Sequence, residues 1–194
     1  MSDAVQRLAE LSPEEKRLLL ARLLREKAAR VRTEPASFGQ QRLWFMDQLV
    51  PGSAFYTLAA AVPLHFAVDP AVLQQCLSEI VRRHEVLRTT FSVHDGQPVQ
   101  VIHPPAPLPL PLPLHDLRAL PASARSAAAA QLAAAEAQRP FDLRTGPLLR
   151  AHLVRLDETE YVFLLTAHHI VADGWSLQLF GRELGALYPA FAAG

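Results

Sequence analysis

Residues 161–174 read YVFLLTAHHIVADG, an apolar run that leads directly into two histidines, an aspartate and a glycine. The apolar part has the length and composition of a buried β-strand, which puts His168 and His169 at its carboxyl end, where α/β folds place their ligands. Successive side chains of a strand point to opposite faces, so at most one of the two imidazoles can face a given cleft. We expect one histidine to be structural and the other to be a candidate functional group.

This histidine pair has two interpretations. Both rings could be hydrogen-bonded packing residues at a strand end, or one ring could be a base that a substrate reaches. A neutral imidazole suits proton transfer near pH 7 when a second group fixes its tautomer, and Asp173 or a backbone carbonyl could do so. Gly174 would permit a positive φ or a close approach to a ligand. Trp175 and Ser176 would start a helix whose positive end favours an oxyanion.

Other chemistries fit the sequence less well. Adjacent histidines on a strand diverge, and His169 with Asp173 offers two ligands where catalytic zinc takes about three from the protein, so we predict no metal site. A Ser-His-Asp triad through Ser176 would need an exposed nucleophile, and the chain has no G-x-S-x-G elbow to present one. Cys76 is the only cysteine, which rules out an internal disulfide and a cysteine-based zinc cluster.

The composition indicates a globular protein without the excess of charge that binding to a highly charged partner would require. Half of the 194 residues are hydrophobic, and 19 basic residues balance 19 acidic ones. A formal net charge of zero leaves no footprint for a nucleic acid or an anionic membrane surface. The amino terminus lacks the features of a secretory signal, and the apolar run at residues 161–172 is far shorter than the roughly 20 residues of a membrane span. We therefore expect a single-domain, soluble, cytoplasmic protein with no nucleic-acid or membrane partner.

Residues 1–36 are predicted to form an N-terminal helix and a linker. Ser12 is a helix cap, Pro13 suits the first helical position, and Glu15 completes a capping box. Leucines at helical spacing follow until the sequence TEP at residues 33–35 interrupts the pattern. Such a helix could pack on the domain or dock a neighbour, and its periodicity does not choose between these roles.

The remaining residues, 37–194, alternate between helical and strand patterns. Ser37 and Gln40 repeat the capping-box spacing, Asp69 caps a later helix, and Asp95-Gly96 is the turn of a β-hairpin. Helices are predicted at residues 38–49, about 70–84, 122–138 and after 174, and strands at about 55–66, 87–93, 98–102, 148–156 and 161–166. This order predicts an α/β fold (α+β, two-layer) in which a mixed β-sheet is covered by helices.

Two local predictions concern burial. The stretch PPAPLPLPLP at residues 104–113 has proline too often for a helix or a central strand. We expect it to run extended over the surface, with leucines that could line a neighbouring groove. On the helix at residues 38–49, Leu43, Trp44 and Leu49 are expected to be buried.

Four stretches resemble one family, the condensation domains of nonribosomal peptide synthetases. They are SFGQQRLWFMDQLVPGSAFY at 37–56, RHEVLRTTF at 83–91, RPFDLRTGPLLR at 139–150, and HHIVADGWS at 168–176, which matches the family motif HHxxxDGxS. The resemblance covers about the first half of the family's domain. It implies a chloramphenicol acetyltransferase-like fold of two lobes in a V. Residues 37–194 would be the N-terminal lobe, and the C-terminal lobe would be a missing partner.

By motif position, the resemblance implies that His169 is the functional histidine. It would either accept the amine proton or position the amine and stabilise the tetrahedral intermediate. His168 would support it. Asp173 would point away from the cleft and pair with Arg88 of the second motif, which would hold the loop in shape, and Gly174 would keep the tunnel floor narrow.

The resemblance also suggests roles around this motif. Arg83 would give further structural support, although a solvated helix end explains it equally well. Trp175 and Ser176 would contact the substrate.

The implied reaction joins two acyl groups through an amide bond, and the sequence is most similar to the subtype that joins two L-configured residues. Each acyl group would be a thioester on the 4'-phosphopantetheine arm of a donor or acceptor peptidyl carrier protein, so no cofactor would bind this chain directly. The lobe by itself is expected to be inactive. The alternatives are a freestanding coenzyme A-dependent acyltransferase of the chloramphenicol acetyltransferase type, and a non-catalytic lobe that docks carriers through the helix at residues 12–32.

Overall fold

The computed structural model describes residues 11–28, 30–105 and 110–194, and its centre is a four-stranded sheet in the order β2-β7-β6-β5. The strands of this sheet are β2 (Thr57–Leu64), β5 (Leu114–Asp116), β6 (Leu149–Arg155) and β7 (Tyr161–His168). β7 pairs antiparallel with both β2 and β6, while β5 pairs parallel with β6. The predicted mixed sheet is therefore confirmed.

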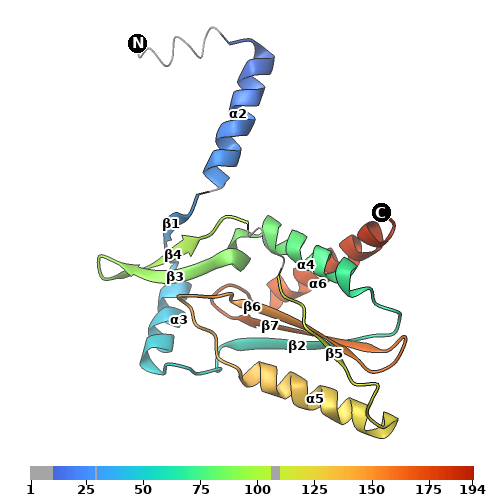
Figure 1. Cartoon of the computed structure of the whole chain (residues 1–194). Helices are drawn as coiled ribbons and strands as arrows, with labels where there is room; N and C mark the ends of the chain where they lie inside the picture. Colours follow the sequence, from blue (N-terminus) through green and yellow to red (C-terminus); the bar gives the residue numbers. More distant parts are fainter. Residues whose placement is uncertain (1–10, 29, 106–109) are drawn as a thin grey trace.

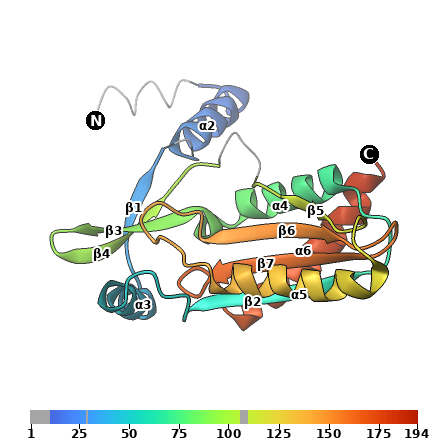
Figure 2. The same ribbon diagram turned by 60° about the horizontal axis from the view of Figure 1, so that its bottom comes forward.

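Helices cover both faces of this sheet, where two layers were expected (Figures 1 and 2). α4 (Pro70–Arg83) and α6 (Gly174–Ala192) lie on one face, and α5 (Ala122–Gln138) lies on the other. Along β7, Phe163 and Leu165 join the core beneath α4 and α6, whereas Leu164 packs with Ala129 of α5. Because both faces are covered, nearly every side chain of β7 is buried, which explains its continuous apolar sequence.

The predicted caps and turn are confirmed. The Asp69 side chain accepts hydrogen bonds from the amides of Ala71 (2.8 Å) and Val72 (3.3 Å) at the start of α4. α3 (Phe38–Leu49) begins at the predicted capping box of Ser37 and Gln40. The hairpin of β3 (Thr89–His94) and β4 (Gln97–Ile102) turns at Asp95 and Gly96, whose φ angles are 49° and 76°, as a type I′ turn requires.

Three other predictions about local structure and burial are wrong or incomplete. Residues 32–35, expected to be linker, form β1 (Arg32–Pro35), which adds to β4 and completes a second sheet in the order β1-β4-β3. Leu87 and Arg88, expected in a strand, lie in the 3-10 helix η1 (Glu85–Arg88). Trp44 is buried and Leu43 is partly buried, but Leu49 is 59% exposed because α3 ends there at the surface.

The proline-rich segment runs outside regular structure where it is described, and it leads into β5. Leu110 and Leu112 are partly buried and pack against the core cluster that includes Leu73 and Leu77 of α4. Residues 106–109 of this segment lie outside the described residues.

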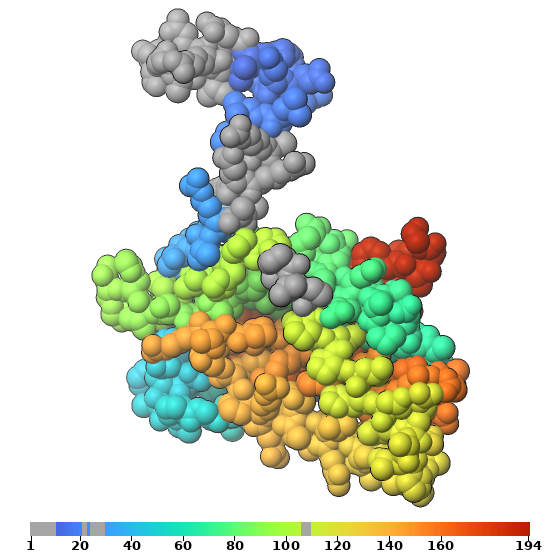
Figure 3. Space-filling model, viewed as in Figure 1, coloured from blue at the N-terminus to red at the C-terminus, as the bar shows by residue number. Residues whose placement is uncertain are grey.

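α2 (Pro13–Ala28) begins with the predicted capping box, since Ser12 and Glu15 exchange hydrogen bonds. The helix projects from the rest of the molecule (Figures 1 and 3). Leu18, Leu20 and Leu23 are exposed on it. Across the described ranges, no helix combines the length and the apolarity that crossing a membrane requires.

One largely buried ion pair ties α5 to the sheet. The Arg150 Nε atom lies 3.0 Å from Glu136 Oε2, and His152 Nε2 lies 3.4 Å from Glu136 Oε1. The side chains of Arg150 and Glu136 are only 13% and 16% exposed. Burial alone would raise the pKa of Glu136, but His152, Arg139 and Arg150 outweigh it and hold this pKa below its ordinary value of 4.5.

We expect Glu136→Gln to lower the free energy of unfolding by about 3 kcal/mol at pH 7, because it leaves the largely buried Arg150 guanidinium without a carboxylate and with only backbone carbonyls as acceptors. Since the folded state lowers the pKa of Glu136, the carboxylate stabilises the protein above about pH 4.5 and loses this effect as the pH falls through the folded-state pKa. Urea unfolding from pH 7 to pH 3 measures both effects. Glu158→Gln, at a carboxylate that is 69% exposed, is the control and should cost less than about 1 kcal/mol. Equal losses for the two variants would contradict the prediction.

Candidate functional site

The end of β7 is held by backbone hydrogen bonds to segments on both sides of it. The amide of His168 donates to the carbonyl of Leu148 (3.0 Å), and the amide of His169 donates to the carbonyl of Tyr56 (2.8 Å). A further bond from the amide of Val171 to the carbonyl of His168 (3.0 Å) closes the turn that follows. These bonds fix which way each of the two histidines points.

His168 is the structural histidine of the pair. Its side chain is buried, with 3% of the residue exposed, and it lies edge-on to the rings of Tyr56 and Phe141. The amide of Ile170 donates to its Nδ1 atom at 3.1 Å. Burial, and after it the charge of His169, lowers the pKa of His168 from 6.5 to about 4. The ring is therefore neutral near pH 7, and its proton is on Nε2 because Nδ1 acts as an acceptor.

His169 is the histidine that the structure presents to solvent. It is exposed, and its ring makes no hydrogen bond within the described part of the chain. The alternation predicted for the pair is thus observed: one imidazole enters the core and the other leaves it. Of the two rings, only that of His169 is exposed at the surface.

Asp173 does not form the predicted ion pair with Arg88. Its Oδ1 atom accepts hydrogen bonds from the amide (2.7 Å) and the hydroxyl (2.6 Å) of Ser176, so it is the N-cap of α6. These bonds, first the one from the Ser176 hydroxyl, lower the pKa of Asp173, and His169 adds to this effect through its charge. Asp173 does not hydrogen-bond the His169 ring, so it does not fix its tautomer in this structure. Asp173 does not need Arg88 as a partner, because the amide and the hydroxyl of Ser176, three residues away, already satisfy its carboxylate.

The two arginines of the second motif make contacts elsewhere. Arg88 donates to the carbonyl of His103 and lies 3.3 Å from a Glu85 carboxylate oxygen. Arg83 pairs with Glu79 at 2.6 Å on the exposed end of α4, which is the solvated helix end that was the alternative for this residue. Neither guanidinium reaches the histidine loop through a hydrogen bond or an ion pair.

Gly174, Trp175 and Ser176 start α6 beside the histidine loop, as predicted. Gly174 does not use a positive φ, and a methyl group added there would meet no atom within 4 Å. Trp175 is 70% exposed. Trp175 and Ser176 both border a small cavity of about 120 Å³ that reaches Ile80 of α4. The predicted contact of Trp175 and Ser176 with the substrate stays a prediction.

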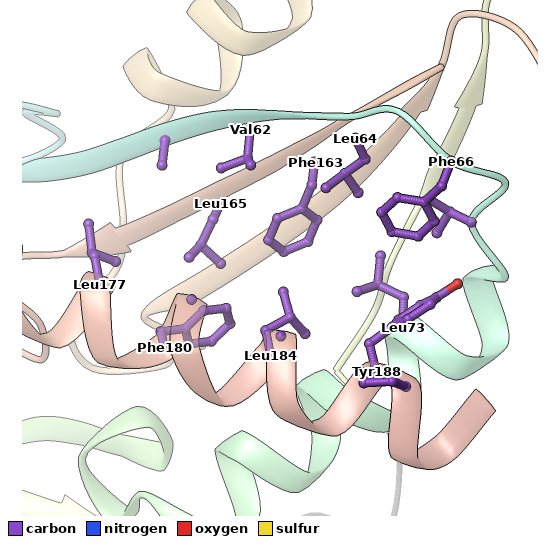
Figure 4. A pocket seen from close by; sticks show the side chains of 15 residues that line it. Val62, Leu64, Phe66, Leu73, Phe163, Leu165, Leu177, Phe180, Leu184 and Tyr188 are labelled. Carbon is purple, nitrogen blue, oxygen red and sulfur yellow. The ribbon is translucent and has the colours of Figure 1, made fainter. Parts of the chain in front are cut away.

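Two larger pockets lie close to these residues, and the sequence pattern indicated neither of them. The first, of about 430 Å³, separates α6 from β2 and β7 and has an apolar lining without a charged side chain or a histidine (Figure 4). Its lining includes Val62, Phe163, Leu165, Leu177 and Phe180. The second, of about 290 Å³, lies between α3 and the end of β7.

We refer to this second pocket as the α3 pocket. Residues of α3 and of the loop after it line the cavity, and His168 borders it from β7. Tyr56 both lines it and supplies the carbonyl that holds His169. Tyr56 belongs to the first motif, but the hydrogen bond to His169 is accepted by its backbone carbonyl, which every residue has. The sequence therefore could not indicate this role. Asp47 also lies in that motif, and only the fold shows that it faces a cavity.

The comparisons with known proteins point to one family. Residues 31–194 match the family model described as condensation domain. The chain is 52% identical over 159 residues to chondramide synthase cmdD of Chondromyces crocatus, which covers 82% of this chain and 4% of that protein. It is 44% identical to phosphinothricin tripeptide synthetase PhsC of Streptomyces viridochromogenes, over 100% of this chain and 19% of that protein.

Solved structures agree with this result. The starter condensation domain of rhizomide synthetase RzmA superposes with a TM-score of 0.77 at 28% identity, covering 84% of this chain and 38% of that one. The first condensation domain of the CDA synthetase gives a TM-score of 0.76 at 26% identity, covering 84% of this chain and 41% of that one. The chain thus spans a small part of these curated relatives and about two fifths of the solved domains.

The fold is therefore the chloramphenicol acetyltransferase-like fold of these domains, and the chain belongs to the condensation-domain family of nonribosomal peptide synthetases.

Proposed function

We propose that this chain is the N-terminal lobe of a domain that forms a peptide bond between two carrier-bound thioesters. The donor and acceptor groups would each be held on the 4'-phosphopantetheine arm of a peptidyl carrier protein, and a C-terminal lobe would complete the site. The observation that carries this proposal is the exposed imidazole of His169, which stands at the motif position of the family's functional histidine.

In the proposed reaction, the amine of the acceptor attacks the carbonyl carbon of the donor thioester. A carbon–nitrogen bond forms, the carbon–sulfur bond breaks, and the donor's arm leaves as a thiol. The amine must lose a proton, and the His169 ring could accept it or could position the amine while the tetrahedral intermediate forms. The oxyanion of that intermediate would lie near the start of α6, where backbone amides and the helix dipole favour negative charge.

Asp173 would act as a positioning residue in this scheme. By capping α6, it holds the first turn of that helix against the histidine loop. The role of Asp173 then depends on its acceptor oxygen, and an ion pair with Arg88 is not needed. Another residue whose side chain can cap a helix should therefore be able to substitute for Asp173.

The subtype that joins two L-configured residues is supported by the resemblance of RHEVLRTTF and DGWS to that group. A second candidate is thioester transfer from coenzyme A. It is favoured by the relation to RzmA, because that condensation domain was solved in complex with C8-CoA. Comparing carrier-bound donors with coenzyme A-bound donors distinguishes the two candidates.

We expect His169→Ala, in a domain completed with its second lobe, to lower the rate of dipeptide formation by about a hundredfold or more, because proton transfer and amine positioning are both lost. Single-turnover assays with two loaded carriers measure this rate. His94→Ala, at an exposed histidine in the β3–β4 hairpin, is the control and should react at the normal rate. A normal rate for His169→Ala would refute the assignment.

Asp173→Ala should lower the free energy of unfolding through loss of the cap, and Asp173→Ser should recover most of that loss together with activity. The Asp173 and Arg88 side chains are not paired. The changes in the free energy of unfolding caused by Arg88→Ala and Asp173→Ala should therefore add up, within about 0.5 kcal/mol, to the change in the double variant. Urea unfolding of the two single variants and the double variant measures the coupling. A coupling energy well above about 1 kcal/mol would show that an ion pair forms after all.

The 194-residue chain by itself should form no dipeptide above background from two loaded carriers, because one wall of the tunnel would be missing. Mass spectrometry of the carriers detects the product. Activity should return when a matching C-terminal lobe is added. Rapid dipeptide formation by the single chain would contradict the half-site proposal.

A further inference from the structure

The proposed reaction gives no role to the second motif, RHEVLRTTF at residues 83–91, whose two arginines do not bond to the histidine loop in the described part of the chain. Other side chains of this motif contact neighbouring elements. Glu85 pairs with Arg32 of β1, and His84 pairs with Glu183 of α6. Because the third motif forms the first turn of α6, a contact between the second motif and this helix can affect the site.

His84 is held rigidly at the corner between α4 and η1. It is the C-cap of α4, and its amide donates to the carbonyl of Ile80 at 3.0 Å. Its own carbonyl accepts a hydrogen bond from the amide of Leu87, also at 3.0 Å. From this corner the His84 Nε2 atom lies 2.8 Å from Glu183 Oε1. An ionised carboxylate can only accept, so Nε2 carries the hydrogen of this bond.

The Glu183 carboxylate depends on this hydrogen bond. Its side chain is 20% exposed, and its second oxygen, Oε2, is buried without a hydrogen-bond partner among the described residues. If the His84 donor were removed, a largely buried carboxylate would be left without a partner. Burial of an unpaired charge is costly, so this part of α6 would move until water reached the carboxylate.

The middle of α6 has little helical stability of its own. Gly181 and Gly185 lie two residues before and two residues after Glu183, and glycine is unfavourable inside a helix. Neither glycine has a positive φ, and a methyl group added at either one would meet no atom within 4 Å. Close packing therefore does not require glycine at these positions. The position of the first half of α6 must then depend on tertiary contacts such as the one at Glu183.

The same corner of the second motif lies next to the start of α6. His84 and Leu87 line the small cavity of about 120 Å³ together with Ala172 and Ser176 of the third motif. The two motifs therefore share a cavity, although no arginine joins them. A shift of α6 relative to His84 would change the position of the histidine loop and of the first helical turn.

We propose that His84 is a positioning residue, whose hydrogen bond to Glu183 holds α6 against the second motif and thereby sets where the helix begins relative to His169. The inference rests on the proposed function, which places the developing oxyanion near the start of α6. His84 acts through the helix and does not touch the reacting atoms. A contact that only stabilises the fold would lower the unfolding temperature without changing the rate of the folded enzyme.

A second hydrogen bond between the same two helices provides a matched control. The Tyr188 hydroxyl accepts from the amide of Asp69 at 2.8 Å, at the opposite end of α4 from His84. Tyr188 lies beyond Gly185 and is therefore farther along α6 from the histidine loop. Tyr188→Phe removes this bond and keeps the ring. It should lower the unfolding temperature but leave the start of α6 in place.

The test is the single-turnover rate of dipeptide formation in the completed domain. His84→Leu keeps the bulk but removes the donor, so the rate should fall about tenfold. His84→Gln should recover most of the rate, because its amide nitrogen can take the place of Nε2. Tyr188→Phe should stay within about twofold of the normal rate. The double variant of His84→Leu and Glu183→Leu should be no slower than the slower single variant, since both remove the same bond.

A second measurement does not depend on the reaction. In the first turn of α6, the amide of Leu177 donates to the carbonyl of Asp173 at 3.0 Å. His84→Leu should speed the hydrogen exchange of this amide about tenfold in the 194-residue chain, because the helix start opens more often. Tyr188→Phe should change this exchange less than about twofold. Thermal unfolding verifies that each variant is folded.

The outcomes separate this inference from the proposed function. If His84→Leu reacts at the normal rate while His169→Ala is slow, the positioning role is wrong and the proposed function stands. Equal slowing by His84→Leu and Tyr188→Phe would show a general effect of helix packing and would also overturn the positioning role. If His169→Ala condenses normally, the proposed function is wrong, and the exchange of the Leu177 amide alone decides whether His84 holds the start of α6.

Discussion

Burial of β7 on both faces is the constraint on which the rest of this structure depends. The strand lies between β2 and β6, with α4 and α6 packed on one face and α5 on the other. A strand in this position cannot twist or shift without exposing apolar side chains, so its carboxyl end is fixed in space. Backbone bonds to Leu148 and Tyr56 then anchor the two consecutive histidines from opposite sides. The inward direction of His168 and the outward direction of His169 follow from this arrangement.

The same constraint divides the chemistry between the two rings. His168 loses water on entering the core, which lowers its pKa to about 4 and keeps it neutral. A neutral ring with one nitrogen used as an acceptor is a hydrogen-bond donor of fixed direction. His169 keeps its solvent, and no hydrogen bond within the described residues restrains its ring. The pair therefore combines a buried, rigidly held ring with an exposed one, although the two side chains are chemically identical.

Several charged groups of the sequence motifs are paired with near neighbours along the chain. Asp173 is bonded to Ser176, and Arg83 is bonded to Glu79, in each case within four residues along the chain. The Glu136–Arg150 pair is an exception, since it joins a helix to the sheet. Local pairs form at a low entropic cost because the chain already holds the partners together. For Arg83, this explains why the guanidinium does not reach across to the histidine loop in this structure.

By itself, the sequence determined the local elements and the identity of the candidate base. Helix caps at Ser37 and Asp69, the turn at Asp95-Gly96 and the alternation at His168 and His169 all depend on neighbouring residues, which a sequence displays directly. The tertiary structure alone decided what depends on distant segments. β1 exists because β4 offers it a free edge, Asp173 caps α6 instead of pairing with Arg88, and Asp47 meets His168 across a pocket. Such contacts form when the packing of the core brings together residues that are far apart in the chain. The spacing of residues in the sequence does not show which of them become neighbours in space.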